Sequence, residues 1–180
     1  MASLCAIRRS GRAGQGRMPI MDILELDGVH VTVARAQVDD LPAIISLLAD
    51  DVLGRDREST DAEPYETAFR QIERDSNQLV IVVREADAAD GPMLATMQLT
   101  LMPSLSRGGA VRLQIEAVRV AASARGTGLG TALFQWAHEW GREHGARLAQ
   151  LTTDSSRTGA HRFYERLGYE ASHVGFKLPL

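Results

Sequence analysis

The sequence has one cysteine, Cys5, and one lysine, Lys177, among its 180 residues. A single cysteine excludes an intrachain disulfide and is typical of a reducing compartment, so we expect a cytoplasmic protein. The only lysine lies outside the glycine-rich stretch of the chain, which excludes a Walker A loop for nucleotide hydrolysis. No apolar run approaches the roughly 18 residues of a membrane-spanning helix, and we expect no membrane partner.

An excess of positive charge is also absent. The net charge is -3 and 44% of the residues are hydrophobic, which suits one globular domain and argues against a nucleic-acid partner. The charge is uneven, because residues 1–17 contain four arginines and no acidic residue. We predict a flexible basic extension over residues 1–20 and a single domain over residues 28–180. A start at Met18 or Met21, or an organelle transit peptide, would also explain the extension.

The hydrophobic pattern changes between strand and helix periods from residue 29 onward. Strands are expected over residues 29–35, 78–87, 93–102, 111–120, 147–153 and 172–180, and helices over residues 38–51, 65–75, 129–140 and 158–168. Asp39 or Asp40 is the candidate N-cap of the first helix. This order predicts a layered α/β or α+β domain with a partly antiparallel sheet.

The strand expected over residues 111–120 changes phase near its end. Leu113, Ile115 and Ala117 alternate with polar residues, but the next apolar positions are Val118 and Val120. A slip of one residue in a pattern of period two is what a β-bulge produces, and bulges are frequent beside active sites. A strand end that is buried on both faces would give the same pattern, so both interpretations stay open.

Three glycines, Gly126, Gly128 and Gly130, stand where the helix over residues 129–140 begins. Glycine weakens a helix interior by about 1 kcal/mol relative to alanine, so stability does not explain them. The first N–H groups of a helix lack partners and carry partial positive charge, which favours a phosphate ligand. The letters G-T-G-L-G-T depart from the dinucleotide fingerprint, and no acidic residue follows about 20 positions later. A plain flexible turn and a nucleotide-binding fold are the alternatives.

Two motifs resemble those of the GNAT N-acetyltransferases. Residues 125–130 fit the pattern R/Q-x-x-G-x-G/A, and "HRFYERLGY" over residues 161–169 is similar to the segment that follows it in that family. The resemblance implies an acetyl-CoA-dependent acyltransferase without a metal. It also implies a mixed, mostly antiparallel seven-stranded sheet flanked by about four helices, with a V-shaped opening between strands 4 and 5. The phase change falls in the fourth strand, where the family has its bulge.

The resemblance also implies how the cosubstrate is held. The main-chain N–H groups of the glycine loop would bind the CoA pyrophosphate, and the strand before it would pair with the pantetheine arm. The candidate cofactor-binding residues are Val118, Arg119, Val120, Arg125, Gly126, Thr127, Gly128, Leu129, Gly130 and Thr131. Arg125 would add charge near the phosphates, or it is a solvated arginine. Arg157 departs from the family, which often has an asparagine there.

Acetyl transfer to an amine needs a base for the amine and a proton for the leaving thiolate. Tyr164 matches the family's thiol-protonating tyrosine, although it also shares a helical face with Phe163 and Leu167 that predicts core packing. Glu116, on the polar side of its strand, is the candidate general base, directly or through water. A surface or paired carboxylate is the alternative, since the family's bases vary in position and Gln114 points the same way.

In the family that the chain resembles, the first two helices and the loop between them shape the acceptor site. Here that region is acidic around residues 50–66 and would attract a cationic amine. A solvated acidic loop is the alternative, and an amino sugar, a protein N-terminus or a lysine are other acceptors. Because Cys5 lies outside the expected domain, we predict direct transfer from acetyl-CoA to a small primary amine in a ternary complex. A catalytically silent acetyl-CoA-binding sensor is the competing hypothesis. The oligomeric state stays open, with a homodimer among the alternatives because many members of the family are dimers.

Overall fold

A mixed sheet forms the centre of the molecule. The computed structural model describes residues 7–8, 20–26, 28–50, 58–88 and 91–180. In these ranges the sheet contains β1 (Ile7–Arg8), β2 (Ile20–Leu26), β3 (Val29–Arg35), β4 (Gln78–Glu85), β5 (Ala95–Met102), β6 (Val111–Val120) and β7 (Ala146–Gln150). The strands follow one another in sequence order, and all neighbours are antiparallel except β6 and β7, which are parallel. The predicted mixed, mostly antiparallel α/β sheet is confirmed.

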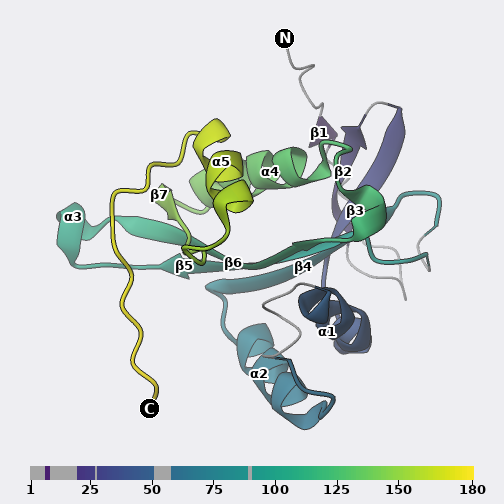
Figure 1. The fold of residues 1–180 in the computed structure, drawn as a ribbon, viewed down its shortest axis with the longest axis horizontal. Coiled ribbons are helices and arrows are strands. Elements are labelled where there is room, and N and C mark those ends of the chain that lie inside the picture. Colours follow the sequence, from purple (N-terminus) through teal and green to yellow (C-terminus); the bar gives the residue numbers. More distant parts are fainter. Residues whose placement is uncertain (1–6, 9–19, 27, 51–57, 89–90) are drawn as a thin grey trace.

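Helices cover both faces of this sheet (Figure 1). On one face lie α1 (Leu41–Ala49), which follows a short 3-10 turn, and α2 (Glu63–Arg74). On the other face lie α4 (Leu129–Glu143) and α5 (Thr158–Arg166). The four-residue α3 (Ser106–Gly109) forms the turn between β5 and β6. The result is a three-layer arrangement, with the sheet between α1 and α2 on one face and α4 and α5 on the other.

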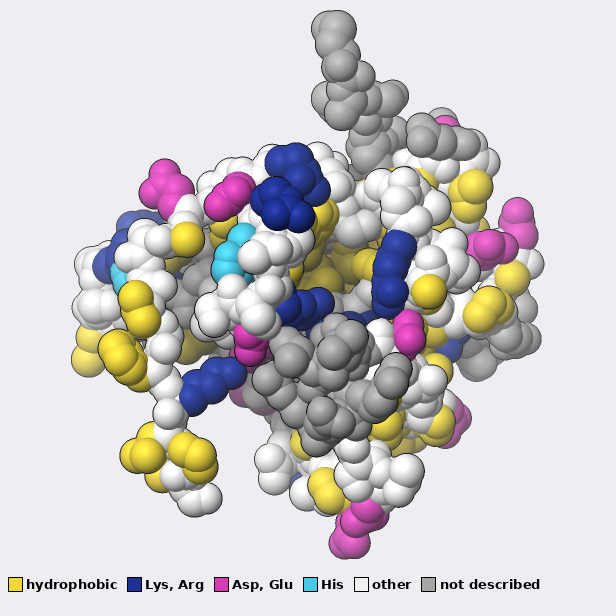
Figure 2. All heavy atoms as spheres, viewed as in Figure 1, with side chains coloured by type: hydrophobic (Ala, Val, Ile, Leu, Met, Phe, Trp, Pro, Cys, Tyr) yellow, Lys and Arg dark blue, Asp and Glu magenta, His cyan; other side chains and the backbone are white. Residues whose placement is uncertain are grey.

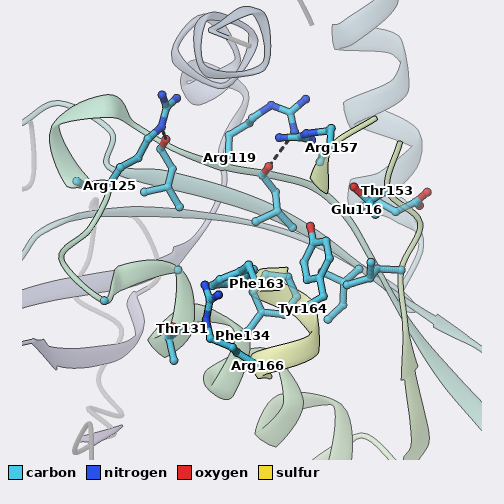
Figure 3. Close-up of a pocket in the computed structure, with 18 of the residues that line it drawn as sticks. Glu116, Arg119, Arg125, Thr131, Phe134, Thr153, Arg157, Phe163, Tyr164 and Arg166 are labelled. Atoms are coloured by element: carbon cyan, nitrogen blue, oxygen red, sulfur yellow. Dashed lines mark hydrogen bonds between the residues drawn. The ribbon is translucent and has the colours of Figure 1, made fainter. Parts of the chain in front are cut away.

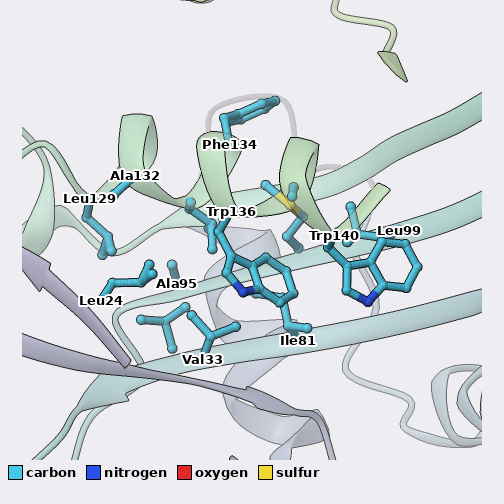
Figure 4. Packing of buried hydrophobic residues seen from close by; sticks show 14 of the residues in the cluster. Leu24, Val33, Ile81, Ala95, Leu99, Leu129, Ala132, Phe134, Trp136 and Trp140 are labelled. Atoms are coloured by element: carbon cyan, nitrogen blue, oxygen red, sulfur yellow. The ribbon is translucent and has the colours of Figure 1, made fainter. Parts of the chain in front are cut away.

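The main core lies between α4 and the sheet (Figure 4). Leu129 of α4 is 1% exposed and points toward the strands, where Leu24 and Val33 are fully buried, whereas Phe134, also 1% exposed, points to the other side of the helix. Trp136 also packs there, and its indole Nε1 donates a hydrogen bond of 2.6 Å to Oδ2 of the buried Asp22. Because burial of each large apolar side chain here stabilises the fold by roughly 1.5–3 kcal/mol, this packing holds α4 on the sheet.

A second, smaller core lies under α1 and α2, and an ion pair joins it to the sheet. Arg84 on β4 donates a hydrogen bond of 2.9 Å to Oδ1 of Asp40, and the Arg84 and Asp40 side chains are 11% and 7% exposed. The other oxygen, Oδ2, accepts a hydrogen bond of 2.8 Å from the main-chain N–H of Gln37. Asp40 thus stands at the N-cap position of α1, as predicted, but its side chain caps the preceding turn and pairs with β4 rather than capping the helix.

The set of strands differs from the prediction at both ends of the chain. The strand predicted over residues 172–180 is wrong, because this segment pairs with no strand of the described sheet. Sequence reasoning also missed β2, where the buried Asp22 interrupts the apolar alternation because it accepts the hydrogen bond from Trp136. Of the predicted basic extension, residues 1–6 and 9–19 lie outside the described residues, and Ile7–Arg8 pairs with β2.

Two helical glycines are expected to respond in opposite ways to alanine. An added Cβ at Gly141 of α4 would lie 2.8 Å from Cδ2 of the buried Leu113, so G141A should lower the free energy of unfolding by about 1–3 kcal/mol through overpacking. Gly159 of α5 has no atom within 4 Å of such a Cβ, so G159A should raise it by about 0.4–1 kcal/mol. Urea unfolding of both variants checks this. Equal effects would contradict it.

Candidate active site

Strand β6 contains the bulge that the change of phase suggests. Its register against β5 shifts between Thr96 and Gln98, so two residues, Ala117 and Val118, lie opposite a single β5 residue. Ala117 has a φ of 50°, in the left-handed region that is unfavourable for residues other than glycine. The interpretation as a β-bulge is confirmed. The bulge interrupts the regular pairing of β6 with β5.

Beyond the bulge a V-shaped opening separates β6 from β7, as predicted. The two strands pair only from Val111 to Gln114 on β6 and from Ala146 to Gln150 on β7. Past these positions a cleft of about 420 Å³ lies between residues 115–120 and residues 151–153. Because no strand fills this side, the edge of β6 faces the cleft with its main chain available to a ligand.

The glycine loop lies at one end of this cleft. Gly126 and Gly128 have φ values of 82° and 84°, so the turn requires glycine at both positions. Among the described residues, no hydrogen-bond partner is found for the main-chain N–H groups of residues 126–128 or of Gly130 and Thr131. Of the predicted set, Thr127 and Leu129 do not line the cleft, since the Thr127 hydroxyl donates to Ala124 O at 2.8 Å and the Leu129 side chain is buried in the core.

Arginine side chains surround the cleft (Figure 3). Arg125 Nε donates to the carbonyl of Val120 at 3.1 Å, and Arg119 Nη1 donates to the carbonyl of Val118 at 2.8 Å. Arg125 also pairs with the carboxylate of Asp50 at 3.1 Å, so it is not merely solvated. With two further cleft arginines, Arg157 and Arg166, four guanidinium groups face one carboxylate, that of Glu116. The cleft is therefore cationic in a chain whose net charge is -3.

Tyr164 lies both against the core and at the cleft, so the two interpretations of its sequence position are compatible. Its ring packs edge to face with Phe134 at a centroid distance of 5.6 Å, and its side chain lines the cleft. Burial raises its pKa above the usual value of 10, while the positive charges of Arg157 and Arg119 act in the opposite direction. The phenol is therefore protonated at neutral pH and can donate a proton.

The structure distinguishes Glu116 from Gln114. Glu116 is exposed and lines the cleft, whereas the side-chain carbonyl of Gln114 accepts a hydrogen bond of 2.7 Å from Gln150 Nε2 and lies outside the cleft lining. In the close-up of Figure 3, Glu116 lies beside Thr153, on the opposite side of the view from Arg125 and Thr131. Glu116 is thus the one carboxylate of the described chain that could accept a proton inside this cleft.

Several carboxylates of the acidic region that was predicted to attract the acceptor have partners in the structure. Asp50 pairs with Arg125, and Glu66 pairs with Arg70 at 3.1 Å. Glu58 accepts a hydrogen bond of 2.7 Å from the Tyr65 hydroxyl and thereby raises the pKa of Tyr65. Asp51 and Asp56 lie outside the described residues. A second cavity, of about 710 Å³, is lined by residues from α1 and from the segment that leads into α2, and its acidic residues are Asp39, Glu58 and Glu66.

Sequence reasoning did not assign several cleft residues to the site. Phe134 and Phe163 line the cleft as well as the core, and Thr153 and Arg166 also face it. The aromatic pair carries only the apolar signal of a buried helix face, which does not distinguish core from cleft. Arg166 follows Tyr164 by two residues on α5 and carries no sequence signal of its own.

The half-buried side chain of His138 makes the stability of the fold depend on pH. Its Nε2 lies 2.7 Å from the Tyr169 hydroxyl, and burial, followed by the charge of Arg142, lowers the pKa of His138 below 6.5. The unfolded chain therefore binds more protons just below pH 6.5, so stability is lost as the pH falls through this range. H138Q should flatten the dependence of Tm on pH between about pH 5 and pH 7, as measured by thermal denaturation. Parallel curves for both proteins would contradict this.

Comparison with known proteins identifies the family. A crystal structure described as a transcriptional regulator from Bacillus halodurans C-125 is 42% identical, with a TM-score of 0.77 over 84% of this chain and 100% of that chain. Aminoalkylphosphonate N-acetyltransferase from Salmonella typhimurium is 43% identical over 67 residues, which are 37% of this chain and 44% of that enzyme. The match thus spans less than half the length of this curated relative. Glucosamine-6-phosphate N-acetyltransferase from Arabidopsis thaliana shares the fold, with a TM-score of 0.67 and 19% identity over 83% of this chain and 97% of that chain.

The described residues contain neither a candidate membrane-spanning helix nor a candidate metal site. None of their helices is long and apolar enough to cross a membrane, and no group of three or more His, Cys, Asp or Glu side chains is placed to hold a metal ion. The sequence model of the acetyltransferase (GNAT) family matches residues 42–169. This range is more than half of the chain and includes the bulge, the glycine loop and α5. The chain therefore belongs to the GNAT family of acetyltransferases.

Proposed function

We propose that the protein transfers an acetyl group from acetyl-CoA directly to a small primary amine in a ternary complex. The observation that carries this proposal is a single cleft that combines three features. It has unpartnered N–H groups at the start of α4, an open strand edge on β6 and the protonated phenol of Tyr164. A diphosphate, an extended thioester arm and a leaving thiolate need these three features in this order.

The cosubstrate would lie along β6 with its diphosphate at the glycine loop. The N–H groups of Gly126, Gly128, Gly130 and Thr131 offer donors at the positive end of a 15-residue helix. The carbonyls of Val118 and Val120, which now accept hydrogen bonds from Arg119 and Arg125, face the same cleft. A bound pantetheine arm would replace these arginine contacts, and the released guanidinium groups would then be available to the phosphates.

The chemistry would use two side chains of this cleft. The amine must lose a proton to attack the thioester carbonyl, and Glu116 would accept that proton directly or through water. The carbon–sulfur bond then breaks, and Tyr164 would give its proton to the thiolate of CoA. No cysteine nucleophile is needed, since the acetyl group passes straight to the amine nitrogen. Proton transfer of this kind contributes a factor of about 10² to 10⁴ to the rate.

The acceptor would be an amine that is cationic in water. The carboxylates around the second cavity support this choice, because Asp39, Glu58 and Glu66 line it together. A second candidate is an amine that also carries an anionic group. The four cleft arginines favour it, as does the similarity to a segment of aminoalkylphosphonate N-acetyltransferase. A polyamine represents the first class, and an aminoalkylphosphonate the second.

Release of free CoA thiol from acetyl-CoA tests the function. The full chain is assayed against an alkylamine, a polyamine and an aminoalkylphosphonate of similar length, and at least one should give amine-dependent thiol release. Preference for the aminoalkylphosphonate would select the second acceptor class. If acetyl-CoA raises Tm but no amine releases thiol, the protein is a sensor and the proposed enzyme is wrong. The single cysteine supports a cytoplasmic location for this activity.

A further inference from the structure

The arginines of the cleft lie at different places along it. Arg125 donates to the Val120 carbonyl at 3.1 Å, so its guanidinium lies at the end of β6 that leads into the glycine loop, where the diphosphate is proposed to bind. Arg157 lines the cleft from the N-cap position of α5, the helix that contains Tyr164. In Figure 3 Arg125 and Arg157 lie on opposite sides of the view, and Figure 2 shows Lys and Arg side chains of this face over α5 and over the sheet next to it. The diphosphate therefore does not account for Arg157.

The guanidinium group of Arg157 lies close to the phenol of Tyr164. Burial raises the pKa of Tyr164, and the positive charges of Arg157 and then Arg119 lower it. A charge acts on a half-buried hydroxyl in this way only over a short distance. In Figure 3 the Tyr164 hydroxyl points to the side on which both guanidinium groups lie, and Glu116 lies on the same side of the view as Arg157. Arg157 is thus placed at the end of the cleft where the thioester and the amine would meet.

Hydrogen bonds of the main chain hold Arg157 at this end. Its N–H donates to the Asp154 carbonyl at 3.0 Å, and its own carbonyl accepts from the N–H groups of Ala160 at 2.9 Å and His161 at 3.1 Å. The residue is half-buried. Its side chain therefore enters the cleft from the hydrogen-bonded start of α5, which is the kind of support that a binding residue needs.

The balance of charge at this end determines which amines fit. Two guanidinium groups, those of Arg119 and Arg157, stand against the single carboxylate of Glu116, so the reaction end of the cleft is net positive. An alkylammonium ion or a polyamine would be repelled there, because like charges interact strongly in a site partly shielded from water. An amine with an oxyanion of its own brings the missing negative charge. A guanidinium group binds phosphonate or carboxylate oxygens through two parallel N–H bonds.

We propose that Arg157 binds an anionic group of the acceptor, a phosphonate, phosphate or carboxylate within a few bonds of the amine, and so selects the amines that reach Glu116. Resting on the proposed function, this role favours the second of its two acceptor classes. With the oxyanion on Arg157 and the nitrogen toward Glu116, the acceptor would face the thioester in one orientation. Arg157 then contributes to the affinity for the acceptor and not to the affinity for acetyl-CoA.

Steady-state kinetics with matched amines test the proposal. 2-Aminoethylphosphonate, β-alanine and propylamine are similar in length and carry a phosphonate, a carboxylate and no anionic group. The value of kcat/KM should be higher for the two anionic amines than for propylamine, and their order tells which oxyanion Arg157 prefers. R157Q should lower kcat/KM for the better anionic amine by about 10- to 100-fold and leave that for propylamine unchanged. A wild type that prefers propylamine, or a loss in R157Q that is equal for all amines, would overturn the proposal.

The matched control is R162Q, and R157K tests the role of charge. Arg162 is exposed on the same helix and does not line the cleft, so R162Q removes the same charge and should behave as the wild type. R157K keeps the charge without the planar fork and should recover part of the loss. The Tm of each variant should stay close to that of the wild type. A loss in R162Q as large as that in R157Q would show a general effect of charge and contradict a site at Arg157.

A binding measurement separates this inference from the proposed function. Isothermal titration of 2-aminoethylphosphonate and of β-alanine into protein saturated with CoA needs no turnover. The wild type and R162Q should bind at least one of them, R157Q about 10-fold or more weakly, and all three should bind acetyl-CoA equally. If this pattern holds but no amine releases thiol, acetyl transfer is wrong and the Arg157 site stands. If thiol is released but R157Q binds the anionic amine as tightly as the wild type, the site is wrong and acetyl transfer stands.

Discussion

Replacing Tyr164 by phenylalanine is expected to lower kcat by a factor of about 10² to 10⁴, while the affinity for acetyl-CoA stays nearly unchanged. The substitution removes the proton that the phenol would give to the leaving thiolate. It keeps the ring that packs against Phe134 at a centroid distance of 5.6 Å. Steady-state rates of CoA release and a separate titration of acetyl-CoA binding measure the two quantities.

The matched control is Y169F. Tyr169 belongs to the same aromatic cluster, with a centroid distance of 6.0 Å to Tyr164, but its hydroxyl interacts with His138 and does not line the cleft. Y169F removes an equal number of atoms and should keep kcat close to that of the wild type. If Y164F turned over at the wild-type rate, or if both variants lost activity equally, Tyr164 would have no role as proton donor.

An aspartate at Gly130 is expected to weaken acetyl-CoA binding by about 100-fold, since a like charge placed against the diphosphate costs about 3 kcal/mol. Gly130 lies in the first turn of α4, and a Cβ added there would meet Phe163 at an ordinary contact distance of 3.5 Å. Its φ is not in the left-handed region, so the substitution does not strain the main chain. Isothermal titration with acetyl-CoA measures the loss.

The fold of G130D can be checked separately from its binding. A carboxylate in the first turn of a helix interacts favourably with the helix dipole, so the Tm of the free variant should equal or exceed that of the wild type. Asparagine has nearly the same size without the charge, and G130N should lose much less affinity than G130D. Equal losses in the two variants would show that the size of the side chain rather than its charge matters. This result would contradict the proposed binding of the diphosphate at the glycine loop.

The order of strands and helices was largely predictable, because each element that packs on the sheet carries its own apolar period. The two errors, the missed strand β2 and the strand wrongly predicted over residues 172–180, concern tertiary contacts. Asp22 is buried on β2 only because Trp136, 114 residues later, donates a hydrogen bond to it. The segment over residues 172–180 has the alternation of a strand, but a strand needs a neighbour, and alternation cannot tell whether one is present.

The candidate site was predictable where its main-chain geometry requires a particular residue type or changes the apolar pattern of the sequence. The bulge at Ala117 changes the phase of the apolar pattern, and the left-handed turns at Gly126 and Gly128 require glycine. Charged side chains leave no such mark. The contacts of Arg119 and Arg125 with the carbonyls of β6 depend on side-chain rotamers, and no periodicity in the sequence encodes them.

The opening between β6 and β7 has a consequence for amide hydrogen exchange. Because the carbonyls of Val118 and Val120 face the cleft, the N–H groups of the same two residues face it as well and have no strand to protect them. These two amides should exchange rapidly with solvent deuterium in the free protein and slowly once a ligand arm lies along the strand. Deuterium uptake at these two amides would therefore measure the fraction of molecules with a ligand in the cleft, even in a variant without catalytic activity.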